Sequence, residues 1–209
     1  QLGLLYIGFQ ITLALSGLPS VPLNRIVLST LSKTESAHRG RLVVLVSSAV
    51  SLIVTLISLS LALALSLFSD LLPSIWLPAI PIAIAFLVAM PMRILTPIIE
   101  ARQQVENRWI QGSIFNAVES IGSIIVVMSF GQCDSLLTLA LAVSGWKIIF
   151  GLVRTVFVLR REKVSTMAVP PLVSILGALL LLGGVWRPIS LNATILLLAL
   201  LAATIYWVF

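Results

Sequence analysis

The stretch LVVLVSSAVSLIVTLISLSLALALSLF, from Leu42 to Phe68, contains no charged residue. It is longer than the about 20 residues that an α-helix needs to cross the hydrocarbon core of a bilayer. The same character extends along the chain, in which 59% of residues are hydrophobic and 10% are charged, and the mean hydropathy is +1.16. A soluble domain of this size could not bury so much apolar surface, so we expect an integral membrane protein.

Outward from this stretch, the apolar pattern predicts about seven spans in an all-α, polytopic transmembrane helix bundle. They are Leu2 to Leu23, Leu42 to Phe68, Ile75 to Ile99, Ile110 to Phe130, Leu136 to Leu159, Leu172 to Val185 and Ala193 to Phe209. We expect two parts, a five-helix part over residues 1–164 and a terminal transmembrane hairpin over residues 165–209. The chain begins inside an apolar run without an initiator Met, which favours a fragment over a processed amino terminus.

The charges of the predicted loops alternate along the chain. Acidic Asp70 and Asp134 lie in the second and fourth loops, whereas the first, third and fifth loops carry the basic residues Lys33, Arg39, Arg41, Arg102, Arg108, Arg160, Arg161 and Lys163. Because short cytoplasmic loops collect Lys and Arg, we expect these three loops to be cytoplasmic and Gln1 to be external. Only Arg187, in the sixth loop, argues the other way. The net charge of +6 is therefore interpreted as a topology signal, not as a nucleic-acid site.

Two spans contain residues that interrupt helices. Gly17, Pro19 and Pro22 lie in the first span, and the third contains Pro78, Pro81, Pro91 and Pro97. Each proline frees a backbone carbonyl, so we expect kinks in both helices. A kink near Pro91 is either a hinge of the kind that transporters use or a purely structural bend.

The second span has small residues at helical spacing on one face. They are Ser51, Thr55, Ser58, Ala62 and Ser66. Small side chains let helices approach closely, so we predict a packing face. A polar lining for translocation is the alternative.

Charged residues inside the spans are the main functional candidates, because each costs at least ~2.5–3.5 kcal/mol near the bilayer centre. Arg25, Arg93 and Arg154 lie toward cytoplasmic ends, where long side chains can reach lipid phosphates. Glu119 and Lys147 lie at similar depth on consecutive helices and are expected to form an ion pair. Asn116 shares the helical face of Glu119 and is expected to bond the same partner.

Lys147 and Arg154 project from one face of one helix, two turns apart, and Gly151 is expected to leave room between them. Two such cations suit an anionic phosphate crossing the membrane. The predicted substrate-binding residues are therefore Lys147, Arg154, Arg93, Arg25 and Asn116, and Glu119 is the predicted ion-coupling residue. The alternative is an ion pair that only locks two helices together.

The sequence offers little for catalysis. Cys133 and His38 have no partners at metal-ligand spacing, and no nucleophile or phosphate-loop motif occurs. We therefore expect no enzyme, no metal and no cofactor. The alternative function from another class of protein is that of a membrane-embedded transferase, which would need a cluster of reactive groups near a membrane interface.

Several segments carry a family resemblance. They are the basic loop Leu31 to Arg41, the polar run Glu100-Ala101-Arg102-Gln103-Gln104 after a kinked span, the pattern from Pro97 to Arg161, and the final Ile205-Tyr206-Trp207. The chain resembles the oligosaccharide flippases of the multidrug, oligosaccharidyl-lipid and polysaccharide exporter superfamily.

The resemblance implies one lobe, preferably the carboxy-terminal one, of a two-lobe transporter whose amino-terminal lobe is missing here. It also implies alternating-access transport of a polyprenyl-diphosphate-linked sugar unit. A drug or cation antiporter of the same superfamily, with Glu119 coupling the ion, is the nearest alternative. A non-transporting assembly subunit is another.

Overall fold

The computed structural model describes residues 2–131 and 135–159, which contain helices and no strand. In chain order the elements are α1 (Leu2–Lys33), α2 (Ser36–Leu67), the short 3-10 helices η1 (Ser69–Leu71) and η2 (Ser74–Trp76), α3 (Ala79–Leu87), α4 (Met90–Val105), α5 (Trp109–Phe130) and α6 (Leu136–Leu159). The predicted all-helical fold class is confirmed for this part of the chain. The predicted spans Leu172 to Val185 and Ala193 to Phe209 lie outside the described residues.

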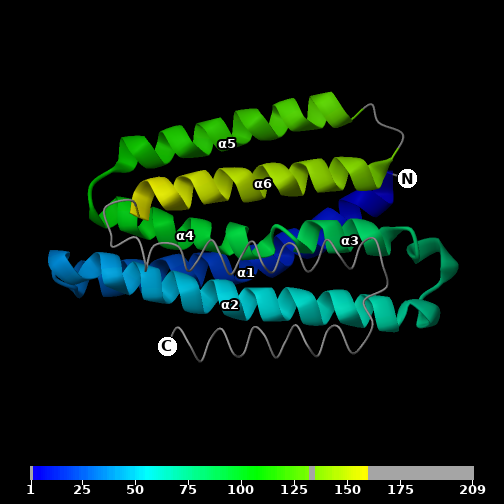
Figure 1. Cartoon of the computed structure of the whole chain (residues 1–209), viewed down its shortest axis with the longest axis horizontal. Coiled ribbons are helices and arrows are strands. Elements are labelled where there is room, and N and C mark those ends of the chain that lie inside the picture. The colour runs from blue at the N-terminus through cyan, green and yellow to red at the C-terminus, as the bar shows by residue number, and fades with distance from the viewer. Residues whose placement is uncertain (1, 132–134, 160–209) are drawn as a thin grey trace.

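Four segments within the described ranges are long and apolar enough to cross a membrane: Ser36–Leu67, Ala79–Val105, Trp109–Phe130 and Leu136–Leu159. They match the second to fifth predicted spans, and together with the composition they indicate a membrane protein. The positions of the described loops also agree with the predicted alternation of basic and acidic loops between the two ends of the bundle. The α1–α2 and α4–α5 connections lie at one end of the bundle, and the α2–α3 connection lies at the other, together with the end of α5 and the start of α6 (Figure 1).

The broken helix formed by α3 and α4 occupies the centre of the described bundle. α1 and α2 pack against α4 from one side, α6 packs against α3 and α4 from the other, and α5 lies outermost on α6 (Figure 1). The apolar window of Ala79–Val105 is accordingly 83% buried, whereas that of α5 is 0% buried. α4 therefore meets protein on most sides, and α5 is held by α6 and by the end of α4.

The first helix is longer than predicted, because α1 continues past Leu23 to Lys33. Its added turns still bury an apolar side, with Val27 and Leu31 packed in the core beside α4. The helix also runs through Pro19 and Pro22 without ending, since a proline removes only one hydrogen bond from the ladder and neighbouring helices can compensate.

The third predicted span is broken at Val88 and Ala89, directly before Pro91. Pro91 has no N–H to donate to the carbonyl of Leu87. Before it, the Ala89 N–H donates to the Phe86 carbonyl, three residues back, at 3.2 Å, which tightens the turn. The helix is therefore interrupted at the place where the kink near Pro91 was predicted. α4 then continues past the predicted end of the span to Val105.

The small-residue face of α2 is a packing face, as predicted. Ser51, Thr55, Ser58 and Ala62 are each 0% exposed, and α2 packs on α3 and α4. The Thr55 hydroxyl donates to the Ser51 carbonyl at 2.8 Å, within its own helix. Close approach of α2 to the central broken helix follows from these small side chains.

Candidate functional site

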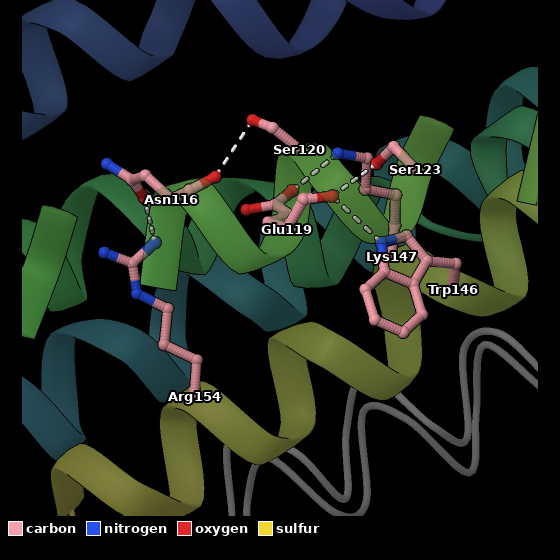
Figure 2. Close-up of polar contacts among 7 residues, drawn as sticks. All are labelled: Asn116, Glu119, Ser120, Ser123, Trp146, Lys147 and Arg154. Atoms are coloured by element: carbon pink, nitrogen blue, oxygen red, sulfur yellow. Dashed lines mark hydrogen bonds and ion pairs between the residues drawn. The ribbon is translucent and has the colours of Figure 1, made fainter. Parts of the chain in front are cut away.

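Glu119 on α5 and Lys147 on α6 form the ion pair that the sequence predicts. Lys147 Nζ donates to Glu119 Oε1 at 2.6 Å (Figure 2). The two side chains keep 24% and 22% exposure. The Glu119 backbone carbonyl also accepts hydrogen bonds from Trp146 Nε1 at 3.2 Å and Ser123 Oγ at 2.7 Å. The carboxylate is therefore held at the α5–α6 contact but is not sealed from its surroundings.

Arg154, two turns further along α6, is only 2% exposed. Its Nη1 donates to Asn116 Oδ1 at 2.9 Å (Figure 2). Its Nη2 donates to Gln103 Oε1 at 3.0 Å and to Glu100 Oε1 at 3.3 Å. The guanidinium carbon also lies 5.6 Å from the centre of the Phe115 ring. The fork of Arg154 thus joins α6 to both α4 and α5, a geometry that lysine could not reproduce.

These contacts correct two expectations. Arg154 does not extend to lipid phosphates, because its head group is enclosed by protein acceptors. Asn116 bonds Arg154 and not the Glu119–Lys147 pair. The reason is that α5 and α6 are antiparallel, so the turn before Glu119 on α5 faces the turns after Lys147 on α6.

Glycines set the spacing of the helices around these charges. We expected Gly151 to leave room between the two cations. It faces α4 instead, where an added Cβ would lie 3.3 Å from Met92 Cβ. An added Cβ on Gly122 would lie 2.0 Å from Cζ2 of Trp146. The absence of a side chain at Gly122 therefore lets the Trp146 ring lie against α5.

Arg93 and Arg25 differ in their relation to this site. Arg93 on α4 is half-buried, and the charge of Glu119 acts on it, although no carboxylate in residues 2–131 and 135–159 forms an ion pair with it. Arg25 is exposed on α1 and makes no ion pair or hydrogen bond with the residues named above. Arg93 is therefore linked to Glu119 through charge alone, without an ion pair, and Arg25 lies outside this group.

We call Arg93, Glu100, Glu119, Lys147 and Arg154 the interior charge cluster. It holds three basic and two acidic side chains, an excess of one positive charge. Glu100 and Gln103 were not predicted as partners of Arg154. Their position in a polar run directly after an apolar span was a signal, but their partner depends on how α4 packs against α6.

Nothing in the described ranges suggests a metal centre, since no group of three or more His, Cys, Asp or Glu side chains there could hold a metal ion. Cys133 lies outside those ranges. Comparisons with protein-family models, with curated proteins and with solved structures found no match to this chain. The candidate site therefore rests on its own geometry.

Proposed function

We propose that this chain is one lobe of a two-lobe, multi-pass transporter with about seven spans in this lobe. It moves a lipid-diphosphate-linked oligosaccharide across the inner (cytoplasmic) membrane by alternating access. The observation that carries the proposal is the interior charge cluster, whose positive excess lies among membrane-spanning helices. Intramembrane charges are costly and mark pathways for ions or substrates. The excess of positive charge favours an anionic substrate, such as a diphosphate, over a cation.

Within this proposal, Lys147 is the cation that meets the substrate. Among the residues that the structure describes it has a single carboxylate partner, and it keeps partial exposure, so an arriving phosphate oxygen can replace Glu119 as its acceptor. Arg154 has Asn116, Gln103 and Glu100 as acceptors and 2% exposure. It therefore positions the helices around the path instead of contacting the phosphate first.

The released Glu119 carboxylate has a second cation nearby. Its charge already acts on Arg93, which lies on α4 just after the break at Val88 and Ala89. Bending at that break changes the distance from Arg93 to α5 and α6. Exchange of Glu119 between Lys147 and Arg93 would thus couple substrate arrival to a change in helix geometry, as alternating access requires.

The test is a flipping assay with the full-length protein in vesicles that contain a lipid-diphosphate sugar. We expect Lys147→Gln to lower the rate at least tenfold, because one charge-assisted hydrogen bond to phosphate is worth ~1.5–3 kcal/mol. Arg41→Ala is the matched control, since Arg41 is an exposed cation on α2, and it should flip normally. A wild-type protein that moves no lipid-linked sugar would refute the proposal.

Glu119→Gln separates the proposed exchange from an antiporter. Under the exchange model, Glu119→Gln slows flipping because Lys147 loses its resting partner. Loss of flipping in Lys147→Gln together with full activity in Glu119→Gln would exclude the exchange step. If instead the protein moves drugs or cations and Glu119→Gln abolishes that movement, the antiporter alternative is correct.

A further inference from the structure

Two adjoining clefts lie where α4 turns into α5. The first is polar, has a volume of ≈ 200 Å³, and is lined mainly by Glu100, Gln103, Gln104, Arg108, Trp109 and Asn116. The second is mainly apolar, has a volume of ≈ 690 Å³, and includes Ile110, Ile114, Phe115 and Phe157. Arg108 and Trp109 line both clefts. A polar and an apolar space thus meet at one cation and one indole ring.

The turn between α4 and α5 builds this junction. Asn107 has a left-handed backbone with φ 57°, which asparagine adopts more readily than most residues. The Arg108 N–H donates to the Gln103 carbonyl at 2.7 Å, and the Asn107 N–H donates to the Gln104 carbonyl at 3.0 Å. These two bonds form a Schellman motif that ends α4. The end of α4 and the first turn of α5 therefore face each other as the two walls of the polar cleft.

The polar cleft contains a buried donor without an acceptor. Gln103 is 2% exposed, and its Oε1 accepts from Arg154 Nη2. Because a guanidinium only donates, this bond fixes the orientation of the amide and directs Nε2 away from Arg154. Nε2 has no hydrogen-bond partner among the described residues. Buried amide groups are normally paired, so this enclosed donor still needs an acceptor, and a shift of the Gln103 side chain would bring it to a ligand in the cleft that Gln103 lines.

The groups in the polar cleft suit a sugar ring. Amide and carboxylate side chains exchange hydrogen bonds with neighbouring hydroxyls, and the negative face of an indole attracts the C–H groups of a pyranose. Trp109 is 58% exposed, so its ring is accessible. The volume of ≈ 200 Å³ is below the ~300–1,000 Å³ of sites for drug-sized ligands, which limits the occupant to about one ring.

We propose that the two clefts together bind one amphiphile, a prenyl-diphosphate-linked sugar. The first sugar ring occupies the polar cleft, the diphosphate lies at Arg108, and the prenyl chain follows the apolar cleft along α5. This inference rests on the proposed function and deepens it, because it names a binding site for the substrate at the basic end of the bundle. Arg108 is held at the junction by Glu106, with Nε 3.2 Å from Oε2.

The probe is farnesyl-diphosphate-linked N-acetylglucosamine, titrated into the purified full-length protein in detergent with native mass spectrometry as the readout. We expect Trp109→Ala and Gln104→Ala each to weaken binding at least tenfold, and Trp109→Phe to retain most of it. Trp76→Ala is the matched control, because Trp76 is also an exposed tryptophan but lies near the opposite end of the bundle, at η2 (Figure 1). It should bind like wild type.

Three further ligands show which part of the probe accounts for its binding. Methyl N-acetylglucosaminide tests the sugar alone, farnesyl diphosphate tests the lipid alone, and phosphatidylglycerol tests an ordinary membrane lipid. We expect each to bind at least tenfold more weakly than the complete probe. Equal binding by any one of them, or unchanged binding in Trp109→Ala, would overturn the proposal.

The outcome is separable from that of the proposed function. A protein that binds the probe in a Trp109-dependent way, but flips no lipid in vesicles, has this site without the proposed transport. A protein that flips normally, and whose Trp109→Ala variant binds the probe like wild type, is a flippase without this site.

Discussion

Arg154 and Lys147 occupy the same face of α6, two turns apart, yet their surroundings differ. Arg154 is 2% exposed and bonds side chains from both α4 and α5. Lys147 is 24% exposed and, within residues 2–131 and 135–159, bonds one carboxylate, from α5. The difference comes from α4, whose last turns supply Glu100 and Gln103 at the level of Arg154. Two cations with equivalent positions on a helix thus differ in how readily they can change partner.

A group with several fixed acceptors holds helices together, whereas a group with a single partly exposed partner can exchange it. Removing one member of a buried polar network leaves the others unpaired, and that penalty exceeds the value of any single bond. The comparison therefore assigns Arg154 chiefly to stability and Lys147 chiefly to function. The following substitutions test that division, from the largest expected effect to the smallest.

The largest effect is expected for Arg154→Met. Breaking a buried ion pair by removing one partner costs ~3–5 kcal/mol, and we expect the lower end, about 3 kcal/mol, because Glu100 keeps 28% exposure. Reversible unfolding in mixed micelles measures the free energy of unfolding. Arg154→Lys should fall between wild type and Arg154→Met, since it keeps the charge and loses the fork. If Arg154→Met lowers the free energy of unfolding no more than Lys147→Met does, the assignment of Arg154 to stability and Lys147 to function is wrong.

Gly122→Ala probes the helix contact beside the Lys147 pair. The added Cβ would lie 2.0 Å from the Trp146 ring, so the ring or the helix must shift, which costs ~1–3 kcal/mol. The same unfolding measurement should show that Gly122→Ala costs almost nothing in a Trp146→Ala background. An equal cost in both backgrounds would mean that Trp146 is not the residue in conflict.

The Glu119–Lys147 pair should contribute less to stability than Arg154 does. Double-mutant cycles between polar residues of membrane helices average ~0.6 kcal/mol and reach ~1.7 kcal/mol. We expect a coupling energy of that size for Glu119→Gln and Lys147→Met. The charge-swapped variant, Glu119→Lys with Lys147→Glu, should retain the coupling while losing transport. A coupling energy above that of Arg154 with Glu100 would reverse our assignment.

The smallest effect is expected for Arg25→Ala. Arg25 is exposed on α1 and makes no ion pair with the interior charge cluster, so the free energy of unfolding should stay within ~0.5 kcal/mol of wild type. Transport should also be unchanged. A transport defect as large as that of Lys147→Gln would extend the substrate path to α1 and restore Arg25 to the predicted binding residues.

Much of the described fold could be predicted from composition and spacing. The charge-free stretch at Leu42 to Phe68 became most of α2, and the proline at Pro91 marked the break between α3 and α4. Both are local properties, since apolar length and a missing N–H act within one helix. The end of α1 was harder, because Val27 and Leu31 extend it by packing against another helix.

The candidate site also has one contact that could be predicted from the sequence and others that could not. The Glu119–Lys147 pair was predictable because equal depth on consecutive antiparallel helices is visible in the sequence. The partners of Arg154 were not, because Glu100 and Gln103 reach it only through the packing of α4 on α6. Long-range partners of this kind depend on which helices are neighbours, and apolar periodicity leaves that open.

The ion pair at the α5–α6 contact also bears on how the protein is made. Glu119 is synthesised 28 residues before Lys147, so a nascent α5 would meet lipid with an unpaired carboxylate. An ionised acid near the bilayer centre costs ~2.5–3.5 kcal/mol on translocon scales. The cation on α6 offsets that cost only once both helices are present. We therefore expect α5 and α6 to leave the translocon together as a hairpin, and ribosome-bound chains that end before Lys147 to insert α5 poorly.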